Sequence, residues 1–256
     1  MTAARGACAH SEPEGSPESD VPDSAVDGSL TAEDASLDRI YLSLPTEPDS
    51  SGLAVAYTAI EGNRPKSNEN TVALWDTWEP ILVGPARTKP LGCVRIASEL
   101  RRSTAFIPYA GLTGSDYLVT YQVGRDLSTM AASLRICLEL GSTPPSGVAL
   151  SVYELRGDRI TVKYETLGGY RPHSLGNWVG AWQGLAGPFG APPPDAWAPV
   201  ASDSTVGLVT LSGLTIIDGF PYRIIYFMGP DAGVPGSAIG AVLTFTAARR
   251  ARSATR

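Results

Sequence analysis

From about residue 39 onwards, the chain alternates short hydrophobic runs with clusters of turn-forming residues. Several runs alternate hydrophobic and polar positions with a period of two, which is typical of strands with one buried face. In 134–140, Leu134, Ile136 and Leu138 fall on one face, whereas Arg135 and Glu139 fall on the other. The predicted strands are 53–60, 71–75, 81–83, 92–97, 104–109, 117–123, 134–140, 148–155, 159–165, 206–217, 222–228 and 239–246. Short strands at this spacing predict an all-β fold, a two-sheet sandwich or a barrel.

The N-terminal segment has a different composition. Residues 1–38 hold nine acidic side chains and one arginine, a net charge of −8, whereas the remainder holds 19 basic and 17 acidic side chains. With no aromatic residue, such a segment buries too little hydrophobic surface to offset the cost of ordering. We therefore predict a disordered acidic arm over 1–38, a β-sandwich domain over 39–248 and a basic tail over 249–256.

One segment between the predicted strands is unusually long. Residues 167–200 are rich in glycine and proline and contain Trp178, Trp182 and Trp197. Connections of this length are uncommon inside compact domains and are often functional. We interpret the segment either as a long loop whose tryptophans pack on their own domain or as a subunit interface, where tryptophan is over-represented.

Residues suited to catalysis or metal binding are few. Of the two histidines, His10 lies in the acidic arm and His173 in the glycine-rich segment, without the spacing of a nucleophile elbow. No histidine and cysteine cluster has the spacing of a zinc site, and no glycine-rich loop has that of a phosphate site. Cys93 and Cys137 lie in hydrophobic runs, which favours buried free thiols. The sequence predicts a protein without enzymatic activity, cofactor or metal.

Targeting signals are also missing from the pattern. The acidic N-terminus has no hydrophobic core of a secretory signal peptide. The most hydrophobic stretch, 207–228, is interrupted by Asp218, Pro221 and Arg223, whereas a membrane span needs about 20 nearly uninterrupted hydrophobic residues. We therefore expect no membrane span.

Two short motifs suggest binding. Arg156, Gly157 and Asp158 match the integrin-recognition tripeptide and lie between two predicted strands, where they equally fit a simple hairpin turn. The second motif consists of the C-terminal arginines Arg249, Arg250, Arg252 and Arg256. Arginine suits phosphate groups, so this tail is either a nucleic-acid contact or a solvated end neutralised by an acidic arm.

Two consecutive predicted strands carry a resemblance to a known family. The stretch 133–140, the Gly/Pro/Ser turn 141–147 and the strand 148–153 resemble paired strands in the jelly-roll coat proteins of picorna-like positive-strand RNA viruses. The phrase Phe106-Ile107-Pro108-Tyr109 and the tryptophan-containing loop are similar to features of the same proteins. The resemblance implies an antiparallel two-sheet jelly-roll sandwich of eight strands.

The function that this resemblance implies is that of a capsid subunit. Such a protein would assemble with copies of itself or with other coat subunits into an icosahedral virion enclosing nucleic acid, after assembly in the host cytoplasm. Genomic RNA would be contacted through the C-terminal arginines. Two alternatives remain open: a carbohydrate- or receptor-binding sandwich that stacks sugars on its tryptophans, and an enzyme that uses His173 with a nearby carboxylate.

Overall fold

The computed structural model describes residues 30–76, 89–109, 112, 116–137, 141–142, 145–185, 189–230 and 238–249. These residues form strands and turns without any helix, and every strand pairing is antiparallel. The first strands are β1 (Leu30–Arg39), β2 (Tyr41–Ser43), β3 (Gly52–Thr58), β4 (Thr71–Trp75), β5 (Gly92–Arg95), β6 (Arg102–Pro108), β7 (Asp116–Gln122), β8 (Met130–Cys137), β9 (Gly141–Ser142) and β10 (Ser146–Gly147). The others are β11 (Ala149–Arg156), β12 (Arg159–Glu165), β13 (Trp178–Gln183), β14 (Ala196–Pro199), β15 (Val206–Ser212), β16 (Pro221–Phe227) and β17 (Ile239–Arg249). The predicted all-β fold of antiparallel sheets is confirmed.

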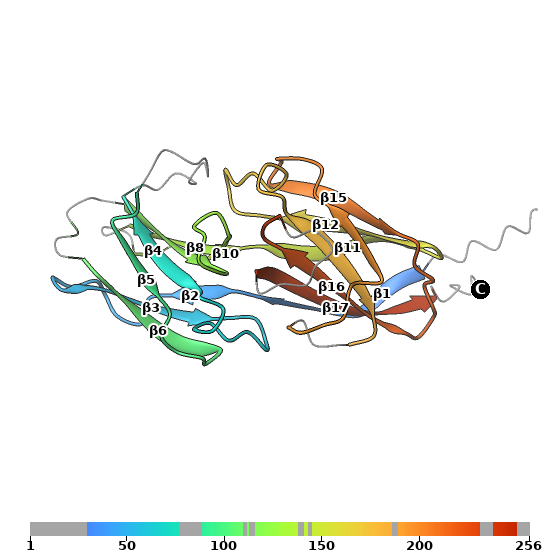
Figure 1. Cartoon of the computed structure of the whole chain (residues 1–256), viewed down its shortest axis with the longest axis horizontal. Helices are drawn as coiled ribbons and strands as arrows, with labels where there is room; N and C mark the ends of the chain where they lie inside the picture. Colours follow the sequence, from blue (N-terminus) through green and yellow to red (C-terminus); the bar gives the residue numbers. More distant parts are fainter. Residues whose placement is uncertain are drawn as a thin grey trace, which may run out of the picture.

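Strands β2 to β8 form one lobe, which we call the first sandwich (Figure 1). One of its sheets has the order β2-β3-β6, and the other contains β8-β7-β4-β5. The two sheets approach each other along both sides, where β5 lies near β6 and β2 lies near β8. The hydrophobic faces of the two sheets enclose Leu53, Val55, Leu74 and Val119, all fully buried.

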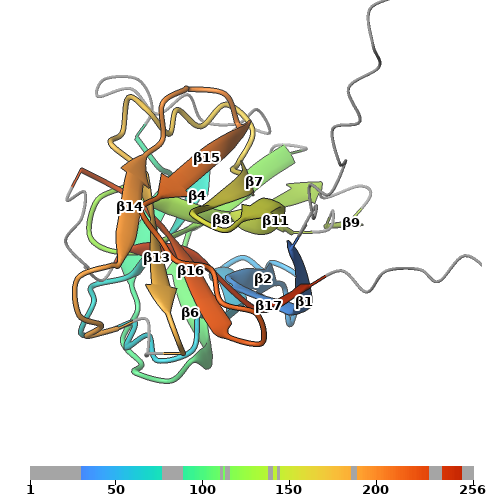
Figure 2. The same cartoon turned by 90° about the vertical axis from the view of Figure 1, so that its right-hand side faces the viewer.

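Strands β11 to β17 form the second sandwich. They belong to an eight-stranded sheet of order β14-β13-β16-β17-β1-β11-β12-β15, which curls until its end strands β14 and β15 lie side by side (Figure 2). Without β1, this sheet divides into β11-β12-β15 and β14-β13-β16-β17. Most buried hydrophobic side chains of both sandwiches belong to one continuous cluster, whereas Ala73, Trp75 and Leu118 form a second, small one.

The two sandwiches have the same strand order. When the strands of each are lettered in chain order, with the fourth called C′, both sandwiches consist of an A-B-E sheet and a C′-C-F-G sheet. This is the connectivity of immunoglobulin-like sandwiches, with the fourth strand moved from the first sheet to the edge of the second. A hallmark of that architecture is also present. Tyr222, near the start of the F strand β16, accepts a hydrogen bond from Ile217 N (2.8 Å) and donates one to the Thr215 carbonyl (3.1 Å). The described residues therefore form a duplicated sandwich, where one eight-stranded jelly roll was expected from the sequence.

The equivalence extends to individual irregularities of the strands. The pairing of β7 with β8 shifts register after Tyr121, and the pairing of β16 with β17 shifts after Tyr226. In the turn before the C strand, Glu69 (φ 53°) and Gly176 (φ 69°) both adopt the left-handed conformation. Asparagine, aspartate and glycine are the residues that tolerate this region best, so a glutamate there is held by the turn around it.

In each sandwich, the slot beside the last strand is filled by a segment outside its own seven strands. In the second sandwich β1 occupies it, with Asp38 opposite Val242 and Arg39 opposite Ala241. In the first sandwich β9 and β10 lie along β8, and β10 leads directly into β11 of the second sandwich. Figure 1 shows the same crossing for β1, which runs along the right-hand lobe before β2 enters the left-hand one. Each sandwich is thus completed by the segment that leads into the other.

The predicted boundary of the acidic arm is wrong, because residues 30–38 form most of β1. The segment is polar, but its backbone pairs with β17 from Leu30 to Arg39, and strand pairing requires no hydrophobic side chain. Leu30, Ala32 and Leu37 also pack against the core from partly buried positions. Residues 1–29 lie outside the described residues.

The predicted long loop 167–200 is also wrong in part. It contains β13 and β14, so only the turn 166–177 and the segment 184–195 lie between strands. The sequence pattern did not predict β13 because this segment is rich in glycine and proline. Gly180, in the middle of the strand, lies between two tryptophan rings. A Cβ atom there would come within 2.8 Å of the Trp182 ring, so the packing demands glycine. The predicted strand 81–83 falls outside the described residues.

Candidate functional site

A polar turn before each C strand is the most conspicuous repeated feature of the two sandwiches. Both copies begin with glycine and continue with Arg-Pro, at Arg64-Pro65 and Arg171-Pro172. Ser67 donates its backbone N–H and hydroxyl to the Glu99 carboxylate, and Ser174 does the same to Asp203. The serine hydroxyls hold the pKa of both carboxyls below its usual value. These groups fasten the turn to the strand connection facing it.

A buried asparagine follows the turn in each sandwich. Asn70 donates to the Tyr121 hydroxyl (2.8 Å), and Asn177 donates to the Tyr226 hydroxyl (3.1 Å). Asn177 also accepts a hydrogen bond from Gly229 N (3.0 Å). Burial raises the pKa of both tyrosines, so the hydroxyls remain protonated donors and acceptors within the core. The repeated polar groups thus hold strands together in both halves, which is a structural task.

His173 belongs to this repeated turn. Its Nδ1 lies 3.0 Å from the Val200 carbonyl, and Lys66 occupies the equivalent position in the first sandwich. Its neighbour Ser174, rather than the imidazole, binds the nearest carboxylate, that of Asp203. Across the described ranges, no group of three or more His, Cys, Asp and Glu side chains could hold a metal ion. His10 lies outside those ranges.

The three tryptophans are not brought to one exposed surface. Trp178 is 1% exposed and stacks on Phe227 with ring centroids 3.9 Å apart, while Trp182 is buried and donates its indole N–H to the Pro192 carbonyl (2.9 Å). Pro192, in the connection between β13 and β14, thus contacts the Trp182 ring. An interface or a sugar-stacking platform that uses Trp178 or Trp182 is therefore excluded by burial. Trp197 is 48% exposed and meets Trp178 only edge-on.

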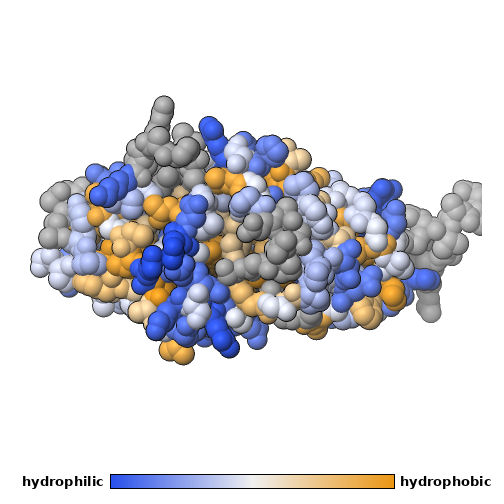
Figure 3. Space-filling model, viewed as in Figure 1, coloured by the Kyte–Doolittle hydropathy of each residue, from blue (hydrophilic) through white to orange (hydrophobic). Residues whose placement is uncertain are grey.

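Trp197 is one of three exposed hydrophobic side chains on β14 and β15, two strands that lie next to each other. On the neighbouring strand β15, Val206 (47% exposed) and Leu208 (50% exposed) also point outward, and we call these three residues the β14–β15 patch. The strand registers place Cys93, Arg102 and Thr104 at the equivalent positions of the first sandwich. On the face shown in Figure 3, hydrophobic residues lie in groups between hydrophilic ones. The two sandwiches thus differ at these three positions, whereas the first sandwich exposes Phe106 (50%) on β6.

The integrin-like tripeptide forms the tip of the β11–β12 hairpin. The Gly157 and Asp158 carbonyls accept hydrogen bonds from Ile216 N (3.0 Å) and Gly213 N (3.2 Å), which fix the turn. Arg156 is exposed and pairs with Glu154 on its own strand (2.7 Å). The hairpin predicted around this motif is confirmed, and the tripeptide is displayed on a rigid projection.

The predicted basic tail begins inside a strand. Arg249 is the last residue of β17, and its backbone N–H (3.0 Å) and side chain (3.6 Å) both contact the Asp218 carboxylate. Leu30 lies directly opposite it. Arg250, Arg252 and Arg256 lie outside the described residues.

Both cysteines in the described ranges are free. Cys137 is partly buried, but Cys93 is exposed, contrary to the expected buried thiol. The reason is its place on β5, an edge strand of its sheet, where one face has no neighbouring layer. Among the described residues, no helix is long and apolar enough to cross a membrane.

The signal that the sequence analysis missed is an internal repeat. Residues 54–75 and 161–182 align without a gap and are identical at nine positions. The shared residues, in the numbering of the first copy, are Val55, Tyr57, Gly62, Arg64, Pro65, Ser67, Asn70, Val72 and Trp75. A search for self-similarity would have revealed the two sandwiches before any strand assignment.

Comparison with protein-family models and with curated proteins found no match for this chain.

Proposed function

We propose that the chain is a non-catalytic structural protein that associates with further copies of itself or with other subunits through the β14–β15 patch. The observation that carries the proposal is the contrast between the two sandwiches. Their buried polar groups are duplicated and serve the fold, whereas Trp197, Val206 and Leu208 are exposed hydrophobic side chains where the first sandwich has Cys93, Arg102 and Thr104. Clustered exposed hydrophobic side chains mark sites of protein contact.

Light scattering coupled to size-exclusion chromatography tests this proposal over a range of concentrations. The unmodified chain is expected to associate as its concentration rises, because association through the patch removes three hydrophobic side chains from water. Leu208→Arg should abolish the association by placing a charge in its centre. Thr104→Arg, at the equivalent position of the first sandwich, is the matched control and should leave it unchanged. A chain that remains monomeric at high concentration would contradict the proposal.

The capsid role is the more specific form of the same proposal. It draws on the sequence resemblance and on the acidic and basic ends of the chain, and it requires closed particles rather than small oligomers. Negative-stain microscopy of the associated chain, with and without RNA, would reveal such particles. Oligomers that never close into shells would leave a structural protein of another kind.

Receptor binding is a second candidate, favoured by the exposed and rigid Arg156-Gly157-Asp158 hairpin. Adhesion of integrin-bearing cells to the immobilised chain should be lost with Asp158→Glu, which lengthens the acidic side chain while keeping its charge. Asp126→Glu, in an exposed turn of the first sandwich, is the control. Equal adhesion to both variants would remove this candidate.

A further inference from the structure

Strand β1 belongs to the second sandwich by its contacts but to the first sandwich by its covalent connection. Within the described residues, β1 pairs with β17 and β11, and Thr31 Oγ1 donates to the Ala248 carbonyl across 217 residues of sequence (3.2 Å). Only Ile40 separates β1 from β2 of the first sandwich. The second sandwich is therefore incomplete without a strand that is not part of its own stretch of chain.

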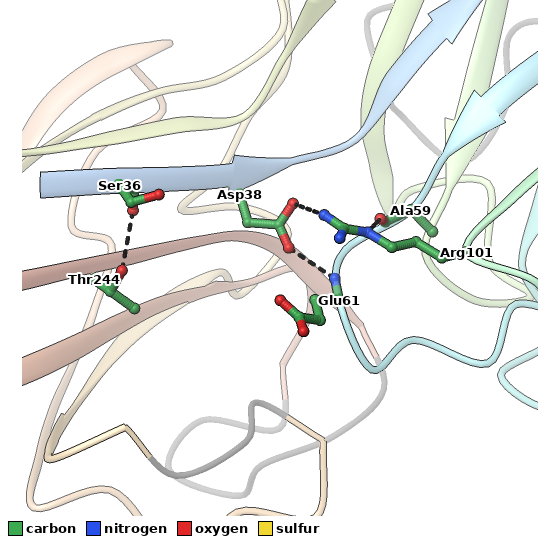
Figure 4. Close-up of polar contacts among 6 residues, drawn as sticks. All are labelled: Ser36, Asp38, Ala59, Glu61, Arg101 and Thr244. Carbon is green, nitrogen blue, oxygen red and sulfur yellow. Dashed lines mark hydrogen bonds and ion pairs between the residues drawn. The ribbon is translucent and has the colours of Figure 1, made fainter.

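The end of β1 is fastened to the first sandwich. Asp38 accepts a hydrogen bond from Arg101 Nη2 (2.8 Å) and one from Glu61 N (2.7 Å), while Arg101 Nε donates to the Ala59 carbonyl (2.9 Å) (Figure 4). These contacts make β1 and the first sandwich one unit. On the other side, Ser36 and Thr244 are directly opposite each other in the pairing with β17.

The equivalent strand in the first sandwich is held differently. Cys137 of β8 lies opposite Gly141 of β9, so the pairing there closes a short hairpin within one stretch of chain. The second sandwich has the same slot in the same register, but β1 and β17 lie far apart in the sequence and are not joined by a hairpin. The slot in the first sandwich is filled locally, whereas that in the second depends on a distant segment.

The covalent joint between the two units is short. β10 pairs with β8 of the first sandwich, β11 pairs with β12 of the second, and Val148 alone separates β10 from β11. Gly147, just before this joint, lies so close to the Ile40 carbonyl that a Cβ atom would come within 3.2 Å of it. A change in direction at Val148 would release one unit from the other; it would break the hydrogen bond from Val148 N to the Ala131 carbonyl (3.0 Å) but no strand pair inside either sandwich.

We propose that β1 is exchanged between copies: the first sandwich of one chain, carrying its β1, completes the second sandwich of another chain. Every contact of β1 with β17 and β11 is the same in the exchanged and in the closed form, so the exchange requires only the change at Val148, between β10 and β11. The partner is a second copy of this chain. The inference shares with the proposed function the assumption of self-association, but it uses β1 and β17 in place of the β14–β15 patch.

Disulfide trapping between two singly substituted chains tests the exchange. In a background with Cys8→Ser, Cys93→Ser and Cys137→Ser, one chain carries Ser36→Cys and the other Thr244→Cys. Directly opposed residues in antiparallel strands are close enough for a disulfide. After mixing at high concentration and mild oxidation, a covalent heterodimer is expected on non-reducing gels. The amount of covalent dimer should exceed that formed by either chain alone at least several-fold.

The first sandwich supplies the matched control. Ser133 and Ser146 are opposite each other in β8 and β10, with hydroxyls 2.9 Å apart, but the short hairpin keeps that pair within one chain. A mixture of Ser133→Cys and Ser146→Cys chains should give no heterodimer. The double variant Ser36→Cys/Thr244→Cys, studied as a dilute monomer, should form an intrachain bond and so show that the site is competent.

The outcomes separate this inference from the proposed function. A heterodimer from the Ser36→Cys and Thr244→Cys chains, absent from the control mixture, supports strand exchange. No heterodimer despite a competent double variant overturns it; if light scattering then still shows oligomers that Leu208→Arg abolishes, the patch proposal stands alone. Monomers throughout would overturn both.

Discussion

Asn70 and Asn177 lie at equivalent positions of the two sandwiches, and each donates its side-chain amide to an equivalent tyrosine on the F strand, Tyr121 and Tyr226. The two asparagines differ in their acceptor oxygen. Asn177 Oδ1 accepts from Gly229 N, whereas Asn70 Oδ1 is buried without a hydrogen-bond partner among the described residues. The same asparagine–tyrosine hydrogen bond therefore occurs in both sandwiches, and the asparagine's hydrogen-bonding groups are more completely paired in the second.

Removal of the two amides should have unequal effects. Asn177→Ala leaves the Tyr226 hydroxyl and Gly229 N–H buried without this partner, so we expect a loss of about 2–4 kcal/mol in unfolding free energy. Asn70→Ala removes one hydrogen bond together with an unsatisfied oxygen, and about 1–2 kcal/mol is expected. Urea denaturation measures both. Equal losses would contradict the unequal roles assigned to the two asparagines.

The loss of stability on replacing each tryptophan should depend on how deeply its side chain is buried. Trp178→Ala removes a ring stacked on Phe227 and opens a cavity, at an expected cost of about 3–5 kcal/mol in unfolding free energy. Trp197→Ala should change that free energy by about 1 kcal/mol or less, because the ring is half exposed, yet it should weaken self-association. Thermal unfolding and light scattering of both variants distinguish these effects. A large loss of stability in Trp197→Ala would contradict the assignment of Trp197 to the exposed β14–β15 patch.

The hydroxyl of Tyr222 should stabilise the connection before β16. Tyr222→Phe keeps the ring but removes the bonds to Ile217 N and to the Thr215 carbonyl, so about 1–2 kcal/mol should be lost on chemical denaturation. Tyr153→Phe, at a position 66% exposed, is the control and should be neutral. The account of this turn fails if the two variants are equally stable.

Buried tyrosines make stability depend on alkaline pH. Burial raises the pKa of Tyr121, Tyr170 and Tyr226 above the ordinary value of about 10. The folded state therefore retains protons that the unfolded state releases, so stability is fully present below about pH 10 and falls as the pH rises further. Tyrosinate absorbance and circular dichroism should change together in this range. Ionisation of all tyrosines with the fold intact would contradict their burial.

The sequence was sufficient for the strands whose periodicity is regular, such as β7, β12 and β16, and for the fold class. It was insufficient where tertiary contacts override local signals. The polar β1 is a strand because β17 and β11 pair with it, and β13 tolerates Gly180 because tryptophan rings fill the space above it. The burial of Trp178 and the exposure of Trp197 likewise depend on tertiary contacts, because Trp178 stacks on Phe227 of β16 whereas Trp197 meets Trp178 only edge-on. Such contacts are not encoded in the local pattern, whereas the repeat of Arg-Pro-x-Ser-x-x-Asn was visible and was missed.

The two equivalent sandwiches are each completed by the segment leading into the other, so that Leu30 lies opposite Arg249 and Gly141 lies opposite Cys137. A circular permutant tests this most directly. It begins at Gly141, continues to Arg249, joins through a short Gly/Ser linker to Leu30 and ends at Cys137. Because every strand pair of both sandwiches is retained, its thermal midpoint should lie within about 5 °C of that of residues 30–249, since a short loop changes stability by only about 1 kcal/mol. A permutant that fails to fold cooperatively would contradict the reciprocal arrangement of β1 and β9–β10.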